Sequence, residues 1–128
     1  MNKLIKYLPR VITGLMMLLF GLDKLMPFMP HPPADPAGVA FKEALVATGY
    51  FFKFVGLSEI FVGAALLSGY FIPLALLVMA PLCIHFILYH IFLDPANIAG
   101  ALMVTGLGLF IAWQNREIYK PFLKLKSE

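Results

Sequence analysis

One acidic residue, Glu59, lies near the middle of an apolar stretch that is long enough to cross a lipid bilayer. The stretch covers residues 51–70, FFKFVGLSEIFVGAALLSGY, and the hydrocarbon core of a bilayer takes about 20 helical residues. A carboxylate at that depth costs about 3 kcal/mol unless it meets a partner, a cavity or a substrate. Glu59 is therefore the first candidate for a functional residue.

A second candidate, His85, lies in the next apolar stretch. Glu59 follows Phe51 by eight positions and His85 precedes Leu93 by eight, so both lie about 12 Å deep at about 1.5 Å per residue. At equal depth the two side chains can meet. Histidine and carboxyl groups both carry protons, so the pair predicts proton transfer to a ligand, with Glu59 and His85 as catalytic residues.

Other polar and aromatic side chains are predicted around these two candidates. Tyr89 follows His85 by four positions and shares its helix face, and Phe52 would add an aromatic wall. Lys24, Lys53 and His90 lie near the outer ends of their helices. Arg10 lies closer to the inner surface, and its long side chain can extend either toward Glu59 or toward that surface. The predicted ligand-binding residues are therefore Arg10, Lys24, Lys53, Phe52, Tyr89 and His90.

Each candidate also has a purely structural interpretation. Glu59 and His85 could form a buried polar clasp that fixes helix packing. Lys53 fits a lysine whose ammonium extends to the membrane surface, and His90 fits an interfacial histidine. A metal site is not predicted, because His85 and His90 are about 140° apart around a helix and one carboxylate completes no convincing ligand set.

The composition indicates a polytopic membrane protein. Of its 128 residues, 61% are hydrophobic and only 13% are charged, and the mean hydropathy is +0.86, which is too apolar for a soluble domain. Apolar segments use nearly the whole length and leave no room for a soluble catalytic domain. The net charge of +3 lies mostly near the two ends, which indicates topology, so no nucleic-acid partner is expected.

The chain is not expected to carry electrons by itself. Cys83 is the single cysteine and lies in an apolar run, so neither a disulfide nor a C-x-x-C motif is available. The sequence also has no haem or iron–sulfur ligand motif. Any redox role therefore needs a partner subunit or a direct donor.

The chain is predicted to be all-α, an integral membrane four-helix bundle that forms one transmembrane domain over residues 1–128. The first span is interpreted as uncleaved, because no small-x-small cleavage site follows its apolar run. Asp94 and Pro95 are expected to open the fourth span as N-cap and first helical residue. The predicted spans cover residues 4–26, 51–70, 72–93 and 95–116, with a proline-rich outer loop at 27–38 and a short interfacial helix at 39–48.

Basic residues near both ends predict that both termini are cytoplasmic. The turn between the third and fourth spans carries only Asp94, and short cytoplasmic segments are enriched in lysine and arginine. We expect a multi-pass protein of a bacterial inner membrane. The basic residues are Lys3, Lys6 and Arg10 near the N-terminus and Arg116, Lys120, Lys124 and Lys126 near the C-terminus.

Three apolar motifs resemble a known family. The runs RVITGLMMLLFGLDKL and GLSEIFVGAALLSGY, and the histidine after APL, look like the DoxX-like membrane proteins over nearly the whole chain. The resemblance implies a four-helix membrane protein and carries over Arg10, Lys24, Glu59 and His85 by position. It also implies a link to redox enzymes, because founding members resemble subunits of a thiosulfate:quinone oxidoreductase, whereas others act as assembly factors. The long proline-rich loop departs from simple members.

Quinone handling is compatible with both the residues and the resemblance. Reducing a quinone adds two electrons and two protons to its carbonyl oxygens, which requires hydrogen-bond donors and a proton path. We therefore expect a quinone or similar lipid-soluble ligand near Glu59 and His85, bound within a membrane redox assembly. The partners would be the lipid bilayer and a redox or other membrane protein, with a homo-oligomer left open. The alternatives are a non-enzymatic scaffold or assembly factor and, with less room in four helices, a proton or solute conduit.

Overall fold

The computed structural model describes residues 2–125, and within this range the chain is helical and has no strand. This confirms the all-α prediction. The helices are α1 (Lys3–Leu25), α2 (Pro36–Ala47), α3 (Phe51–Ser68), α4 (Ile72–Leu93), α5 (Ala99–Gln114) and α6 (Arg116–Tyr119), with 3-10 turns η1 (Pro95–Asn97) and η2 (Lys120–Leu123).

Three of the helices in the described range are long and apolar enough to cross a membrane. They are α1, α3 and α4, with 23, 18 and 22 residues. The apolar helix α5 is shorter, at 16 residues. The chain thus has three candidate membrane spans, which indicate a membrane protein, and each lies within two residues of its predicted bounds.

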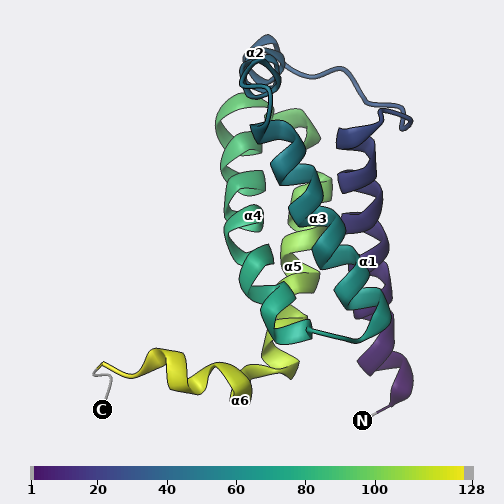
Figure 1. The fold of residues 1–128 in the computed structure, drawn as a ribbon, viewed down its shortest axis with the longest axis vertical. Helices are drawn as coiled ribbons and strands as arrows, with labels where there is room; N and C mark the ends of the chain where they lie inside the picture. The colour runs from purple at the N-terminus through teal and green to yellow at the C-terminus, as the bar shows by residue number, and fades with distance from the viewer. Residues whose placement is uncertain (1, 126–128) are drawn as a thin grey trace.

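The long helices lie side by side and run in alternating directions (Figure 1). Contacts join α1 to α3, α3 to α4, α4 to α5, and α5 back to α1. The two chain ends lie at one end of this group of helices, and α2 lies across the other end (Figure 1). The buried core between the helices includes Met17, Val62, Leu66, Met79, Val104 and Ile111.

Glycines bring α1 and α3 into close backbone contact. A Cβ atom added at Gly21 would lie 2.5 Å from the carbonyl oxygen of Gly56, and one at Gly63 would lie 2.6 Å from the backbone nitrogen of Leu18. Small residues at a helix contact allow the backbones to approach closely, which is how helices gain packing energy in lipid. This contact sets the spacing of the side chains that α1 and α3 present to each other.

Helix α2 begins earlier than predicted and covers one end of the molecule. It begins at Pro36, three residues before the predicted surface helix, because proline fits the first turn, where its missing N–H needs no partner. The helix contacts α3 and α4 and lies crosswise to them (Figure 1). The proline-rich segment leading to it therefore comprises residues 26–35.

The fourth predicted span begins with a 3-10 turn and not with an α-helix. Asp94 and Pro95 open η1 as N-cap and first residue, as expected, but the Asp94 side chain makes no cap hydrogen bond and the α-helix α5 begins only at Ala99. The Asp94 carboxylate accepts hydrogen bonds from Asn97 Nδ2, at 2.9 and 3.1 Å, and from the backbone N–H of Asp35 at 3.3 Å. It therefore ties the α4–α5 turn to the start of α2.

The C-terminal segment leaves the helices sideways. Helix α5 ends at Gln114, two residues before the predicted end, and α6 and η2 then run crosswise and extend away from the other helices (Figure 1). The Tyr119 hydroxyl donates a hydrogen bond of 2.8 Å to the carbonyl oxygen of Pro73, which ties this segment to the start of α4. Lys126, one of the basic residues used to predict orientation, lies outside the described residues.

Candidate functional site

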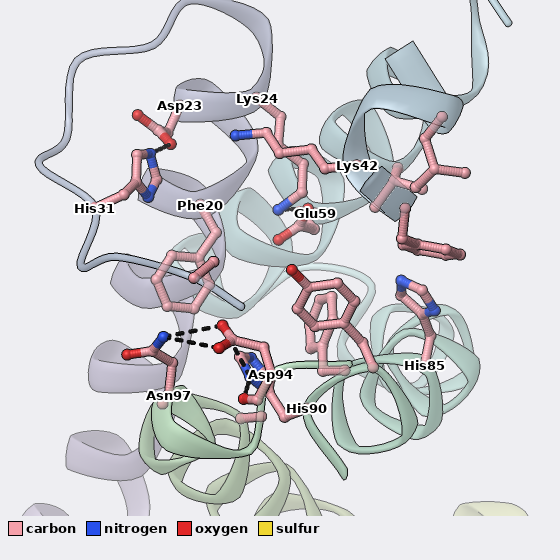
Figure 2. Close-up of a pocket in the computed structure, with 18 of the residues that line it drawn as sticks. Phe20, Asp23, Lys24, His31, Lys42, Glu59, His85, His90, Asp94 and Asn97 are labelled. Carbon is pink, nitrogen blue, oxygen red and sulfur yellow. Dashed lines mark hydrogen bonds and ion pairs between the residues drawn. The ribbon is translucent and has the colours of Figure 1, made fainter. Parts of the chain in front are cut away.

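A cavity of about 390 Å³ lies at the end of the molecule that α2 covers. This volume falls in the range of about 300–1,000 Å³ that is typical of small-molecule sites. Figure 2 shows side chains from separate parts of the chain converging on it. Its polar lining residues are Asp23, Lys24, His31, Lys42, Glu59, His85, Tyr89, His90, Asp94 and Asn97.

Glu59 is fully buried and pairs with Lys24. The Lys24 Nζ atom lies 2.7 Å from Glu59 Oε1, and the side chains are 22% and 0% exposed, respectively. Apart from this ion pair, neither carboxylate oxygen of Glu59 has a hydrogen-bond partner among the described residues. Lys24 reaches Glu59 because the two helices touch at Gly56, where an added Cβ would lie 3.0 Å from the Lys24 Cβ.

His85 lines the cavity and packs against aromatic rings, unlike Glu59, which pairs with Lys24. The His85 ring centroid lies 5.6 Å from that of Phe41 on α2, 6.1 Å from that of Phe86 and 6.3 Å from that of Tyr89. Figure 2 shows the His85 ring apart from the Glu59 carboxylate. Equal depth therefore brings both residues to one cavity, while their angles around α3 and α4 give them different neighbours.

Aromatic rings and lysines form one wall of the cavity. Phe52 and Tyr89 line it, as the sequence predicts, together with Phe86. The Lys24 Nζ lies 5.9 Å from the ring centroids of both Phe52 and Phe86, and Lys42 Nζ lies 5.5 Å from that of Phe52. Cations at these distances are attracted to the ring faces. The wall can thus hold a flat ring beside ammonium donors.

A second polar group lies where α4 ends. His90 Nδ1 lies 3.0 Å from the carbonyl oxygen of Asp94 and 4.0 Å from its Oδ2 atom. Asp94 is only 4% exposed, and Asn97 binds both of its carboxylate oxygens. His90 therefore lines the cavity as part of a hydrogen-bonded turn.

The sequence reasoning missed Asp23 and His31. Asp23 Oδ1 accepts hydrogen bonds of 2.9 Å from the backbone N–H groups of Phe28 and Met29, and Oδ2 lies 2.7 Å from His31 Nε2. This buried carboxylate folds the proline-rich segment back toward the end of α1. One signal was present: an acid near a helix C-terminus is unfavourable for the helix dipole and calls for another partner.

Lys42 was also missed as a cavity residue. It lies within the predicted interfacial helix 39–48, and α2 carries it over the cavity, next to Phe41. The sequence pattern of α2 indicates an amphipathic helix but does not tell which part of the molecule the helix covers. Its position depends on contacts with α3 and α4.

Two predicted ligand-binding residues lie outside this cavity. Arg10 donates from Nε to the carbonyl oxygen of Leu66 at 2.9 Å and lies beside Gly69, at the end of α3 away from α2. Lys53 is exposed on α3. Phe52, Val55 and Glu59 line the cavity at helical spacing, so the neighbouring Lys53 lies on another face. Neither residue therefore lies with the other candidates at this cavity.

A second cavity, of about 400 Å³, lies between α4 and α5 and is lined almost entirely by apolar side chains, including Met79, Cys83 and Leu109. In the described part of the chain, no group of three or more histidine, cysteine, aspartate or glutamate residues is placed to hold a metal ion. The cavity beneath α2 is therefore the stronger candidate, since it combines aromatic walls with convergent polar groups.

Comparison with known proteins adds no relative to this picture. No family model, curated protein or solved structure matches the chain.

Proposed function

We propose that this chain is a DoxX-like, multi-pass protein of a bacterial inner membrane that binds a quinone or similar lipid-soluble ligand beneath α2. It would act as one component of a membrane redox assembly. The observation that carries the proposal is the buried Lys24–Glu59 ion pair at an aromatic-walled cavity of ligand size. Polar groups are rare within membrane spans and commonly mark functional sites.

The lining residues fit a quinone-type ring. Phe52 and Phe86 offer apolar surfaces for the ring, and Lys24, Lys42 and His85 carry N–H groups that can donate to its oxygens. A bound quinone would supply two-electron chemistry at those oxygens. Glu59 and His85 would hold the protons that accompany the electrons, and a partner protein would deliver the electrons.

The membrane arrangement that we propose is a four-helix bundle with cytoplasmic termini. Residues 95–114, which comprise η1 and α5, provide about 20 residues for a fourth span. Lys3, Lys6, Arg116 and Lys120 lie toward the end that holds both termini, as expected for a cytoplasmic face. The cavity would then open toward the outer face.

A scaffold or assembly factor is the second candidate function. One observation favours it: the Lys24–Glu59 ion pair joins α1 to α3, so it accounts for a buried carboxylate without any ligand. In that case the polar groups would stabilise the helix packing, and the cavity would be incidental.

Mass spectrometry of lipid-soluble molecules retained after gentle extraction tests the proposal. We expect a near-stoichiometric quinone-type molecule in the wild-type protein and its loss from a His85→Ala preparation that keeps the wild-type helical circular dichroism. Lys53→Ala, on an exposed face of the same helix as Glu59, is the matched control and should retain the ligand. No ligand in wild type, with a variant that is only less stable, would favour the scaffold.

A further inference from the structure

The Glu59 carboxylate presents a buried oxygen atom without a hydrogen-bond partner. Lys24 Nζ pairs with Oε1, and in the described part of the chain no group hydrogen-bonds to Oε2. Buried polar atoms are nearly always hydrogen-bonded, so each exception calls for an explanation. Since Glu59 lines the cavity, a ligand within it can supply the missing partner.

The other buried carboxylates at the cavity already have hydrogen-bond partners. Asp23 has two backbone N–H groups and His31, and Asp94 has Asn97 and the backbone N–H of Asp35. These interactions hold the proline-rich segment and the α4–α5 turn in place. Glu59 is therefore the acidic group whose hydrogen bonding is incomplete, and it lies at the same cavity as the aromatic rings.

The chemistry of the missing partner follows from the ion pair. The Lys24–Glu59 separation of 2.7 Å is that of a charge-assisted contact, and an ionised carboxylate can only accept hydrogen bonds. A quinone carbonyl also offers only lone pairs, which the carboxylate would repel. A hydroxyl group on the ligand would donate to Oε2 and complete its hydrogen bonding.

We propose that the cavity selects the hydroxyl-bearing, reduced form of an aromatic ligand, a hydroquinone, whose O–H donates to Glu59 Oε2. This inference rests on the proposed binding of a quinone-type ligand and names the redox form that binds more tightly. An aliphatic alcohol shares the hydroxyl, but the rings of Phe52, Phe86 and Tyr89 favour an aromatic group. Selection arises because the quinone leaves Oε2 unpaired.

The test measures binding of four probes to the full chain in phosphatidylcholine nanodiscs, with empty discs as the control for partition into lipid. The probes are trimethylhydroquinone, trimethylbenzoquinone, the dimethyl ether of the hydroquinone, and 1-decanol, under anaerobic conditions that keep the hydroquinone reduced. We expect the hydroquinone to bind at least about tenfold more tightly than the quinone and the dimethyl ether, since a site built for a hydroxyl rejects analogues without it. It should also bind more tightly than 1-decanol, which has a hydroxyl but no aromatic ring to pack against the cavity wall. This series needs no variant.

A Glu59→Gln variant adds an independent measurement. Its side-chain amide can donate to a carbonyl, so the preference for hydroquinone over quinone should fall by about tenfold or reverse, whereas Lys53→Gln should keep the wild-type preference. Equal or tighter binding of the quinone by wild type would overturn the inference and leave the proposed function standing. Equal binding of decanol would overturn the aromatic ligand class. No binding of any probe would overturn both proposals.

Discussion

Lys24 and Glu59 pair alongside the glycine contact between α1 and α3. Gly21 precedes Lys24 by three residues and Gly56 precedes Glu59 by three, but α1 and α3 run in opposite directions, so Lys24 lies beside Gly56 and its side chain extends along the contact to reach Glu59. The close approach at the two glycines brings Nζ within 2.7 Å of Oε1. The ion pair and the glycine contact therefore form one structural unit.

The first prediction concerns the two partners of this ion pair. Lys24→Met leaves a fully buried carboxylate without its cation, and breaking a buried pair in this way costs about 3–5 kcal/mol of folding free energy. Glu59→Gln leaves a lysine that is 22% exposed and can reach water, so its cost should be smaller. Thermal unfolding in detergent should rank the Tm values as wild type, Glu59→Gln, Lys24→Met.

The double variant Lys24→Met/Glu59→Gln provides the control for coupling. It removes both charges, so its Tm should lie above that of Lys24→Met alone. Additive losses in the double variant would show that the two residues stabilise the protein independently, contrary to the ion pair.

The second prediction concerns the glycine contact. Gly21→Ala places a Cβ atom 2.5 Å from the Gly56 carbonyl oxygen, so α1 and α3 must move apart, at a cost of about 1–3 kcal/mol. Gly106→Ala on α5 is the matched control, because no atom lies within 4 Å of its added Cβ. That change should raise Tm slightly, since alanine favours helix over glycine by about 1 kcal/mol. A neutral Gly21→Ala would contradict the contact.

Hydropathy along the sequence was sufficient to predict the three long helices and the depth of Glu59. Depth alone could not identify its partner, because two residues at one depth can face in different directions around their helices. Glu59 and His85 line the same cavity, yet Glu59 pairs with Lys24 across the glycine contact, whereas His85 packs among aromatic rings. The rotation of each helix about its own axis depends on packing between helices, which the local sequence pattern does not reveal.

The loops were the least predictable part of the site. Asp94 before Pro95 is a typical N-cap sequence, but the Asp94 carboxylate makes no cap hydrogen bond. It accepts hydrogen bonds from the Asn97 side chain and from the backbone N–H of Asp35, 59 residues away. Asp23 likewise folds the proline-rich segment through contacts with its backbone. Such contacts depend on tertiary structure, and they help to set where α2 lies. The position of Lys42 over the cavity therefore could not be derived from the sequence of α2.

The third prediction tests how α2 is held over the cavity. A Cβ atom at Gly38 would lie 2.6 Å from the Tyr89 hydroxyl oxygen, so Gly38→Ala should displace α2 even though alanine favours helix. Amide hydrogen exchange should become faster across Pro36–Ala47. Adding Tyr89→Phe removes the colliding oxygen and should return exchange toward the wild-type rate. Unchanged exchange in Gly38→Ala would mean that α2 does not rest on Tyr89.

The fourth prediction tests the proposed orientation. In a Cys83→Ala background, which removes the single native cysteine, Lys3→Cys and Phe122→Cys lie toward one end of the helices, and Ala37→Cys lies on α2 at the other. A membrane-impermeant maleimide should label the first two in inverted vesicles and the third in right-side-out vesicles. Labelling of Lys3→Cys and Phe122→Cys from opposite sides would contradict a bundle with an even number of spans. Complete reversal would overturn only the cytoplasmic assignment.

The fifth prediction concerns the Tyr119 hydroxyl, which joins the C-terminal segment to α4. Burial raises the pKa of Tyr119 above its ordinary value of 10.0, and the hydroxyl donates to the Pro73 carbonyl oxygen. The native state therefore holds this proton more tightly than the unfolded chain, and the associated stability is complete below pH 10 and is lost as pH rises through the raised pKa. Tyr119→Phe should lower stability by about 1 kcal/mol at neutral pH, and this difference from wild type should shrink above pH 10.

Chemical denaturation in detergent across this pH range measures the difference between the two proteins directly, so other groups that titrate in both of them cancel. Tyr70→Phe is the matched control, because Tyr70 is 73% exposed and should differ little from wild type at neutral pH. A constant gap between wild type and Tyr119→Phe would show that the hydroxyl contributes no pH-dependent stability. A gap that closes only for Tyr119→Phe would instead establish that its protonated hydroxyl holds the C-terminal segment against the start of α4.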